Sequence, residues 1–323
     1  MALFPAPTPL EPAPRFSAAI GREVWIKRDD VGSVGYAGNK IRKLSRLVSE
    51  IEERGADTLV IVGARQSNAA RATAALCAAR GWSCVVVVPD DPPAGGALPE
   101  ANALLGELFG ARYEYLGAGT GWAEAEAASR DVAGNAYVLP AGASSPLGAL
   151  GFVDAHRELL DQLDVLGLEP AAIVHASTSG GTSAGLHLGR ARHGGPPVVS
   201  IDVGRLYGED TLPRLAALAT DASEVLDAPS PSPRAFAADD LAVSFAHVGE
   251  GYGAYTNAGL AAIRLLARTE GIVCDPVYSG KALGALVTGD PLLPADGGPL
   301  VFWHTGGAQS VFAARPTGAL LGA

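Results

Sequence analysis

The chain has 323 residues, of which 48% are hydrophobic and 18% charged, so it can bury a large core and does not belong to the disordered class. Its formal net charge of −10, without a basic cluster that has interleaved aromatic residues, excludes nucleic acid and anionic membrane surfaces as expected partners. No apolar run reaches the length of a membrane span and no signal-peptide pattern is present, so we expect a cytoplasmic protein.

Residues 1–20 contain five prolines and predict an extended arm on the protein surface. After this arm, short apolar runs alternate with segments of helical periodicity. The expected strands lie at 23–27, 58–62, 83–88, 111–116, 171–175, 197–202 and 300–303. The expected helices lie at 67–80, 97–109, 121–133, 148–163, 211–219, 256–270 and 280–287, and two more begin at about Lys40 and at about 181.

Strands of continuous apolar residues that alternate with helices indicate parallel sheets covered by helices on both faces. In such folds, ligands bind outside the carboxyl ends of the strands. Three loops that directly follow strands are therefore candidate site segments: 63–68, 176–182 and 304–307.

The three cysteines (Cys77, Cys84 and Cys274) follow no metal-ligand spacing, so we expect buried thiols and no metal site.

Lys40 stands where a glycine-containing loop turns into a helix, directly after Gly38 and Asn39. Glycine lets the backbone pass close to whatever Lys40 contacts. A lysine in this place can form a Schiff base with an aldehyde cofactor if burial lowers the pKa of its amine. The alternative is an ordinary solvated lysine in the first turn of a helix.

The segment 177–182 reads Ser-Thr-Ser-Gly-Gly-Thr between a strand and a helix. Glycines and hydroxyl residues at a helix N-terminus are typical of an anion site, because free backbone N–H groups and the helix dipole favour a phosphate. The segment lacks the lysine of a P-loop, so a phosphate here is expected to belong to a cofactor. A simple helix-capping turn is the alternative.

Ser67 suits the N-cap of the helix that follows it, and it would also face a ligand bound at the strand end. Tyr252 and Tyr278 both lie among turn residues. Loop tyrosines usually pack with a wet hydroxyl, but they also act as acids or bases when a nearby cation lowers their pKa. The residues alone leave both interpretations open.

Taken in order, several short motifs resemble the pyridoxal-phosphate enzymes of the 1-aminocyclopropane-1-carboxylate deaminase and D-cysteine desulfhydrase family. The motifs are Pro-Thr-Pro-Leu-Glu at 7–11, Ile-Lys-Arg-Asp-Asp at 26–30, Gly-Asn-Lys at 38–40, Gln-Ser-Asn at 66–68, the 178–182 loop, Asp-Pro-Val-Tyr at 275–278 and His-Thr-Gly-Gly at 304–307. The resemblance covers nearly the whole chain. It implies the two-domain tryptophan synthase β-like fold (fold type II), with pyridoxal phosphate between the domains.

The resemblance also implies roles for individual residues. Lys40 would bond covalently to the cofactor, the loop Thr178, Ser179, Gly180, Gly181 and Thr182 would bind its phosphate, and Asn68 would hydrogen-bond its 3′-oxygen. Ser67, Asn68 and Ala69 would lie beside the substrate, which Tyr252 and Tyr278 would face. Thr305, with Ser279 as second choice, would partner the ring nitrogen. The large domain would comprise 1–47 and 155–323 and the small domain 48–154, in a homodimer.

Two positions depart from the family pattern: Ala37 replaces a glycine, and Ala69 replaces a glutamine or histidine. The favoured reaction is β-elimination from a small amino acid, with D-cysteine as the leading substrate. Ring-opening members resemble one another in having glutamate where this chain has Ser279, so cyclopropane deamination is the second choice. Racemisation, β-replacement and non-catalytic binding of the cofactor are further alternatives.

Overall fold

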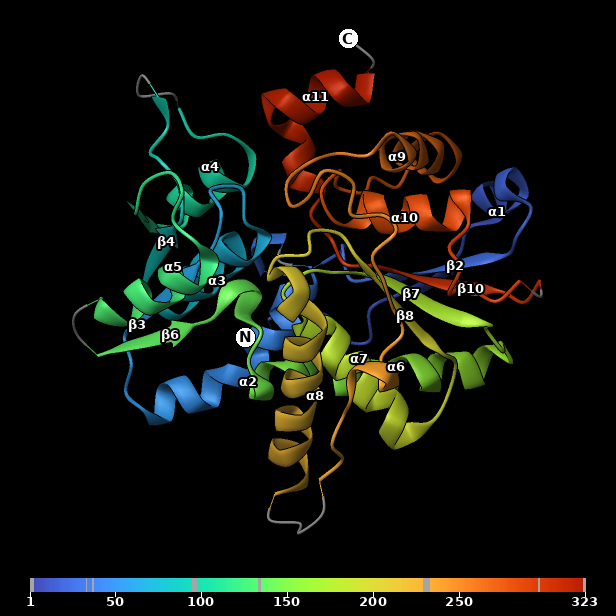
Figure 1. The fold of residues 1–323 in the computed structure, drawn as a ribbon, viewed down its shortest axis with the longest axis horizontal. Helices are drawn as coiled ribbons and strands as arrows, with labels where there is room; N and C mark the ends of the chain where they lie inside the picture. The colour runs from blue at the N-terminus through green and yellow to red at the C-terminus, as the bar shows by residue number, and fades with distance from the viewer. Residues whose placement is uncertain are drawn as a thin grey trace.

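The computed structural model describes residues 3–32, 34–36, 38–94, 98–132, 135–228, 233–295 and 297–321. Strands and helices alternate along the chain and build two sheets that lie side by side (Figure 1). All neighbouring strands in these sheets are parallel except for the first pair. Parallel sheets with helical layers confirm the predicted fold class.

The larger sheet has six strands in the order β1-β2-β10-β7-β8-β9. Their bounds are Leu10–Pro12 (β1), Val24–Arg28 (β2), Leu300–His304 (β10), Ala172–Ser177 (β7), Val198–Asp202 (β8) and Val243–Ser244 (β9). Phe302 pairs with Ile26 on one side and with Val174 on the other, and all three pack in one core cluster. Val301 and Trp303 point to the opposite face because side chains alternate along a strand.

Helices cover both faces of this sheet. On one face lie α1 (Pro14–Ile20), α9 (Asn257–Glu270) and α10 (Ser279–Thr288). On the other face lie α6 (Pro146–Leu166) and α7 (Gly181–His193), with α8 (Thr211–Asp227) packed against both. The short helix α11 (Ala314–Leu321) follows the last strand and contacts α9.

The smaller sheet has four parallel strands in the order β5-β4-β3-β6. Their bounds are Arg112–Tyr115 (β5), Ser83–Val88 (β4), Thr58–Val62 (β3) and Ala136–Leu139 (β6). Helices α2 (Asn39–Glu53) and α3 (Asn68–Arg80) pack on the face that contains Leu59 and Ile61. Helix α5 (Trp122–Ala128) packs on the face that contains Val60 and Val62, while α4 (Ala101–Leu108) contacts α3.

All seven predicted strands are present, with bounds that agree with the predicted ones to within two residues. The extended arm predicted for residues 1–20 is wrong, because this segment contains β1 and α1. Pro14 occupies the first turn of α1, where its missing N–H is harmless, and Phe16 is fully buried against the large sheet. The sequence analysis also missed three short elements: β6, β9 and α11.

The two largest differences in helix length are at α8 and α5. Helix α8 continues to Asp227, beyond the predicted end at 219, and α5 ends at Ala128 before a single 3₁₀ turn at Ser129–Asp131. The predicted start of a helix at 97 and the departure at Ala37 lie outside the described residues.

The four strands of the smaller sheet lie within the predicted segment 48–154, and the domain boundary itself stays a prediction. Helix α2 runs from the region of the larger sheet into the smaller one and contacts α6 (Figure 1). Among the described helices, none combines the length and the apolar character that a membrane crossing requires. The three cysteines are buried and free, as expected.

Candidate active site

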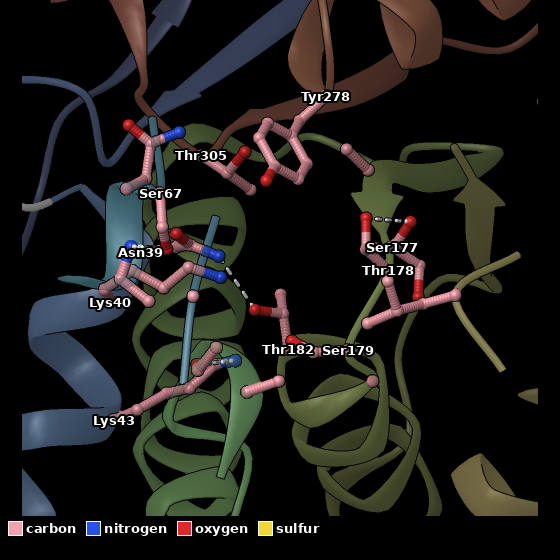
Figure 2. A pocket seen from close by; sticks show the side chains of 18 of the residues that line it. Asn39, Lys40, Lys43, Ser67, Ser177, Thr178, Ser179, Thr182, Tyr278 and Thr305 are labelled. Carbon is pink, nitrogen blue, oxygen red and sulfur yellow. Dashed lines mark hydrogen bonds between the residues drawn. The ribbon is translucent and has the colours of Figure 1, made fainter. Parts of the chain in front are cut away.

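A pocket lies at the carboxyl ends of β3, β7 and β10, where the three candidate loops meet. Gly63 and Ser67 follow β3, Thr178 follows β7, and Thr305 follows β10. Figure 2 shows the side chains of these loops around one cavity, with α2 on one side and the N-terminus of α7 opposite it. The structure therefore brings together segments that are distant in the sequence, as the parallel-strand argument predicts.

Lys40 enters this pocket from the first turn of α2. The turn is docked on the loop after β10, because the Asn39 N–H donates a hydrogen bond to the Thr305 carbonyl at 3.0 Å. Gly38 makes this approach possible: it has φ +59°, and a Cβ there would lie 2.4 Å from the Thr305 carbonyl oxygen. The predicted need for glycine before Lys40 thus has a clear steric reason.

Burial lowers the pKa of the Lys40 amine to about 8. The charge of Asp275 opposes this effect, and the charge of Arg71 adds to it. An amine with such a pKa is partly neutral near neutral pH, and only the neutral form attacks an aldehyde or accepts a proton. The shift favours the interpretation of Lys40 as a reactive lysine over that of a solvated first-turn residue, and its role stays a prediction.

The 177–182 loop connects β7 to α7 and forms the floor of the pocket. Gly180 is the N-cap of α7 with φ +89°, so the first backbone amides of the helix are exposed to the loop. Thr182 accepts a hydrogen bond from the Asn39 side-chain amide at 2.9 Å, and the Ser179 hydroxyl lies 2.9 Å from the Ser144 hydroxyl. A helix N-terminus with hydroxyl side chains around it suits an anion, so phosphate binding by this loop stays a prediction that the geometry allows.

Gly181 does not line the pocket, although its neighbours in the loop do. Its N–H donates to the Ser144 hydroxyl at 3.1 Å. A Cβ on Gly181 would lie 2.7 Å from Ser144 Oγ and 2.8 Å from Lys43 Nζ. Glycine at this position keeps space for a lysine amine close under the loop.

That amine belongs to Lys43, which the sequence analysis did not include in the site. Lys43 is 1% exposed, lines the pocket, and donates hydrogen bonds to Ser144 Oγ at 3.0 Å and to the Gly142 carbonyl at 3.1 Å. Burial, and to a smaller extent the charge of Lys40, lowers its pKa well below the usual value for lysine. The sequence did contain a signal for Lys43: it lies three residues after Lys40, and residues with this spacing lie on the same face of a helix.

Ser67 is the N-cap of α3, as predicted, and its oxygen accepts hydrogen bonds from the Ala69 and Ala70 N–H groups at 3.2 Å. These bonds leave the hydroxyl proton available for donation. Ser67, Asn68 and Ala69 all line the pocket, so capping and a position beside a ligand are compatible.

Asn68 has a fixed orientation. Its side-chain oxygen accepts hydrogen bonds from Arg71 Nη1 at 3.0 Å and from Asn102 Nδ2 at 3.0 Å. With the oxygen occupied twice, the Asn68 NH₂ group is the part that remains for a ligand. Arg71 and Asn102 are fully buried, and neither was in the predicted site.

Tyr252 and Tyr278 meet in the pocket wall, with their hydroxyl oxygens 2.5 Å apart. The Trp122 ring packs edge-on against Tyr252 at 5.6 Å between centroids. Burial raises the pKa of both tyrosines, and the charge of Asp275 adds to this effect. The condition for a tyrosine base, a pKa lowered by a cation, is therefore not met, and the pair consists of neutral hydroxyls.

Thr305 lines the pocket and Ser279 does not. Ser279 is 1% exposed, and its hydroxyl donates to Asp275 Oδ1 at 2.6 Å at the start of α10. Asp275 also accepts hydrogen bonds from the backbone N–H groups of Val277 and Tyr278. This carboxylate caps the N-terminus of α10 and thereby orients Tyr278.

The chain matches the family described as pyridoxal-phosphate dependent enzymes over residues 1–306. It belongs to this family. Among curated proteins, it is 39% identical over 323 residues to D-cysteine desulfhydrase from Klebsiella pneumoniae strain 342, covering 97% of this chain and 95% of the relative. D-cysteine desulfhydrase from Salmonella typhi is also 39% identical, over 327 residues and with the same coverage.

Among solved structures, one described as an ACC deaminase homologue superposes with a TM-score of 0.83 and 32% identity, covering 100% of this chain and 95% of that chain. A fungal L-serine ammonia-lyase from Rhizomucor miehei has a TM-score of 0.67 and 20% identity, covering 99% and 98% of the two chains, and supports the fold alone. These comparisons confirm the resemblance stated from the motifs.

The described residues fit pyridoxal phosphate, the cofactor of this family. The pocket offers the reactive Lys40 amine for an aldehyde, and the α7 N-terminus for a phosphate. The Lys43 amine lies under the 178–182 loop, 2.8 Å from the place that a Cβ on Gly181 would take. The oriented Asn68 amide adds a hydrogen-bond donor to the lining of the same pocket.

Proposed function

We propose that this protein converts D-cysteine and water to pyruvate, hydrogen sulfide and ammonia by β-elimination. The observation that carries the proposal is one pocket in which the Lys40 amine, the Ser67 hydroxyl and the Tyr252–Tyr278 pair line the same cavity. The similarity of the chain, over 97% of its length, to enzymes named D-cysteine desulfhydrase supports D-cysteine as the substrate.

Lys40, Asn68, Lys43 and the 178–182 loop hold the cofactor in this proposal. When bound, pyridoxal phosphate holds the substrate amine and takes up the electron pair left when Cα loses its proton. Lys40, with a pKa near 8, accepts the Cα proton as a neutral amine. Ser67 binds the substrate carboxylate through its free hydroxyl proton, as the N-cap geometry allows.

The tyrosine pair acts on the β-substituent. Because burial keeps both hydroxyls neutral, Tyr278 donates a hydrogen bond to the departing sulfur while Tyr252 orients it. A donor placed where negative charge develops stabilises a departing thiolate. The role that we propose for Tyr278 is therefore that of an acid and not that of a base.

The pocket chemistry favours elimination over ring opening. Among the described residues that line it there is no carboxylate, and Thr305 is the group that we propose for the ring nitrogen. A hydroxyl brings no negative charge, so it stabilises a protonated ring less than a carboxylate would. Departure of thiolate requires less charge delocalisation than opening of a cyclopropane, which has no heteroatom to leave.

The test is keto-acid release by the purified holoenzyme on a panel of D- and L-amino acids and 1-aminocyclopropane-1-carboxylate. We expect pyruvate and sulfide from D-cysteine, pyruvate from β-chloro-D-alanine, and little 2-oxobutanoate from the cyclopropane substrate. Efficient 2-oxobutanoate production with inert D-cysteine would favour the second candidate, which the similarity to an ACC deaminase homologue supports. Racemised substrate without keto acid would contradict both reactions.

The proposal also includes a cytoplasmic homodimer. Three free, buried cysteines suit a reducing compartment. Leu104, Leu108 and Phe312 are exposed large apolar residues on α4 and the neighbouring 3₁₀ turn, and such a patch suits a second copy of the chain. Light scattering on the purified protein measures the oligomeric state, and a monomer at micromolar concentration would contradict this part.

A further inference from the structure

Lys281 is a buried lysine of α10 that the proposed reaction does not use. It is 1% exposed and lies three residues after Tyr278. Its ammonium group donates hydrogen bonds to three backbone carbonyls: Val203 at 2.7 Å, Val248 at 2.7 Å and Gly251 at 3.0 Å. These three bonds use all of its donors, so the ammonium is held in a cage of main-chain oxygens, which we call the carbonyl cage.

The carbonyl cage joins three separate parts of the site. Val203 directly follows β8, and its own N–H donates to the Ser177 carbonyl at the start of the phosphate loop. Val248 and Gly251 belong to the loop before α9, and the Gly251 carbonyl is in the peptide bond to Tyr252. Lys281 itself is on the helix whose first turn follows Tyr278.

Burial lowers the pKa of Lys281, and the charges of Asp202 and Asp275 oppose this shift and favour the ammonium form. Asp202 is 1% exposed, and one of its oxygens has no hydrogen-bond partner among the described residues. Lys281 does not line the pocket, so it acts on the site through the backbone that it holds.

We propose that Lys281 is a positioning residue, a tethered cation whose carbonyl cage sets the 2.5 Å contact between the Tyr252 and Tyr278 hydroxyls. The two tyrosines are 26 positions apart, and the ammonium is a direct link between their backbones. Without a cation, the three convergent carbonyl oxygens lose their shared donor, and that of Gly251 keeps only the long bond from the Ala254 N–H at 3.4 Å, so the loop that carries Tyr252 moves away. The part of this inference that concerns catalysis rests on the proposed function.

Lys27 is a matched comparison within the chain. It is also fully buried, but its ammonium is paired with the Glu158 carboxylate and with Gln162, and among the described residues Thr8 is the one whose backbone carbonyl accepts from it. Removing Lys27 leaves the Glu158 carboxylate still paired with Arg42, whereas removing Lys281 takes the ammonium away from three backbone carbonyls. Converging backbone carbonyls are the ligands with which proteins replace the hydration shell of potassium. This difference makes the inference testable.

The experiment uses the full-length holoenzyme with Lys281→Ala, Lys281→Met and Lys27→Ala in potassium, sodium or choline chloride at equal ionic strength. The readouts are hydrogen exchange of residues 248–253, melting temperature, and kcat and KM for D-cysteine. We expect no salt preference in the wild type. In choline chloride, the backbone amides of residues 248–253 should exchange their hydrogens faster in Lys281→Ala than in the wild type, and kcat should fall about 10- to 100-fold. Potassium chloride should reverse both changes.

The methionine side chain of Lys281→Met fills the space of the lysine methylene chain and leaves no room for a metal ion. We therefore expect this variant to have the lower kcat and the faster exchange in all three salts. Lys27→Ala should melt at a lower temperature without a potassium effect at 248–253. The inference would be overturned if residues 248–253 of Lys281→Ala exchanged their hydrogens at the wild-type rate. It would also be overturned if they exchanged faster and potassium did not slow them. Exchange and melting do not depend on the substrate. A holoenzyme inert toward D-cysteine that still shows the potassium effect would refute only the proposed function.

Discussion

The side-chain amide of Asn39 donates a hydrogen bond to Thr182 Oγ1 at 2.9 Å, which ties the residue before Lys40 to the first turn of α7 (Figure 2). Both side chains are buried, with 7% and 4% exposure. The bond fixes the distance between the amine proposed to bond the cofactor and the loop proposed to bind its phosphate. A rigid cofactor requires that these two ends of the site keep one spacing.

Thr182→Val should therefore weaken cofactor binding and lower stability. Valine keeps the shape of threonine but leaves the buried Asn39 amide without its acceptor, which costs about 1–3 kcal/mol. Cofactor titration and chemical denaturation measure the two effects, and Thr182→Ser is the control because it keeps the hydroxyl. Equal affinity of the valine and serine variants for pyridoxal phosphate would contradict this prediction.

Gly180→Ala should also weaken cofactor binding, although not because the new Cβ enters the pocket. At φ +89° the backbone of an alanine is strained, and its Cβ would lie 3.2 Å from the Leu215 side chain, so either that side chain or the first turn of α7 has to give way by a few tenths of an ångström. Gly208→Ala is a matched control, since Gly208 has φ +59° and open space around its Cβ position. We expect both variants to lose about 1–2 kcal/mol of stability from strain, and Gly180→Ala alone to lose affinity in the cofactor titration.

Lys40→Ala should abolish turnover and the yellow colour of the holoenzyme while the protein stays folded. Borohydride reduction followed by peptide mass mapping identifies the lysine that carries the cofactor in the wild type. Lys43→Ala is the comparison: it should keep the reducible bond but bind the cofactor more weakly, because Lys43 lies under the phosphate loop. A reducible bond that survives in Lys40→Ala would transfer the role to another lysine.

The pH dependence of cofactor capture follows from the Lys40 pKa of about 8, lowered from 10.5 by burial. In the cofactor-free protein, the rate of bond formation with pyridoxal phosphate should rise with pH and level off above about 8. Between about 8 and 10.5 the unfolded chain binds the extra proton, so the Lys40 contribution to stability rises with pH in this window. Lys40→Met should remove that rise, and denaturant titrations at pH 7, 9 and 10.5 measure it.

The strand-end loops were predictable because the strands before them are continuous apolar runs, as in β3 and β7, and parallel strands end at one edge. Lys43 was not predictable in the same way. A lysine in a first turn is usually solvated, and only the packing of α2 against the 142–144 segment buries it. In the same way, the proline-rich segment around Phe16 forms helix α1 because it packs against α9, which is distant in the sequence. The burial of Lys43 and the formation of α1 both depend on tertiary contacts, which the pattern of neighbouring residues in the sequence does not reveal.

The orientation of Asn68 leads to the last prediction. Arg71 and Asn102 both donate to its side-chain oxygen, so its NH₂ group is the free donor in the pocket. Asn68→Asp keeps an acceptor for both donors and pairs a carboxylate with the Arg71 guanidinium, so the fold should be retained or stabilised. The variant loses the only donor at this position, and a negative charge now faces the oxygen that we propose Asn68 binds.

We therefore expect Asn68→Asp to bind pyridoxal phosphate at least about tenfold more weakly, which corresponds to about 1.4 kcal/mol, and to shift the pKa of the bound chromophore in a spectroscopic pH titration. Asn102→Asp is the matched variant, because it places a carboxylate against the Asn68 oxygen and forces the Asn68 amide to rotate. It should shift the same titration, although Asn102 lies outside the pocket lining. Unchanged spectra and affinity in both variants would mean that Asn68 does not contact the cofactor, and its role would then be limited to holding Arg71.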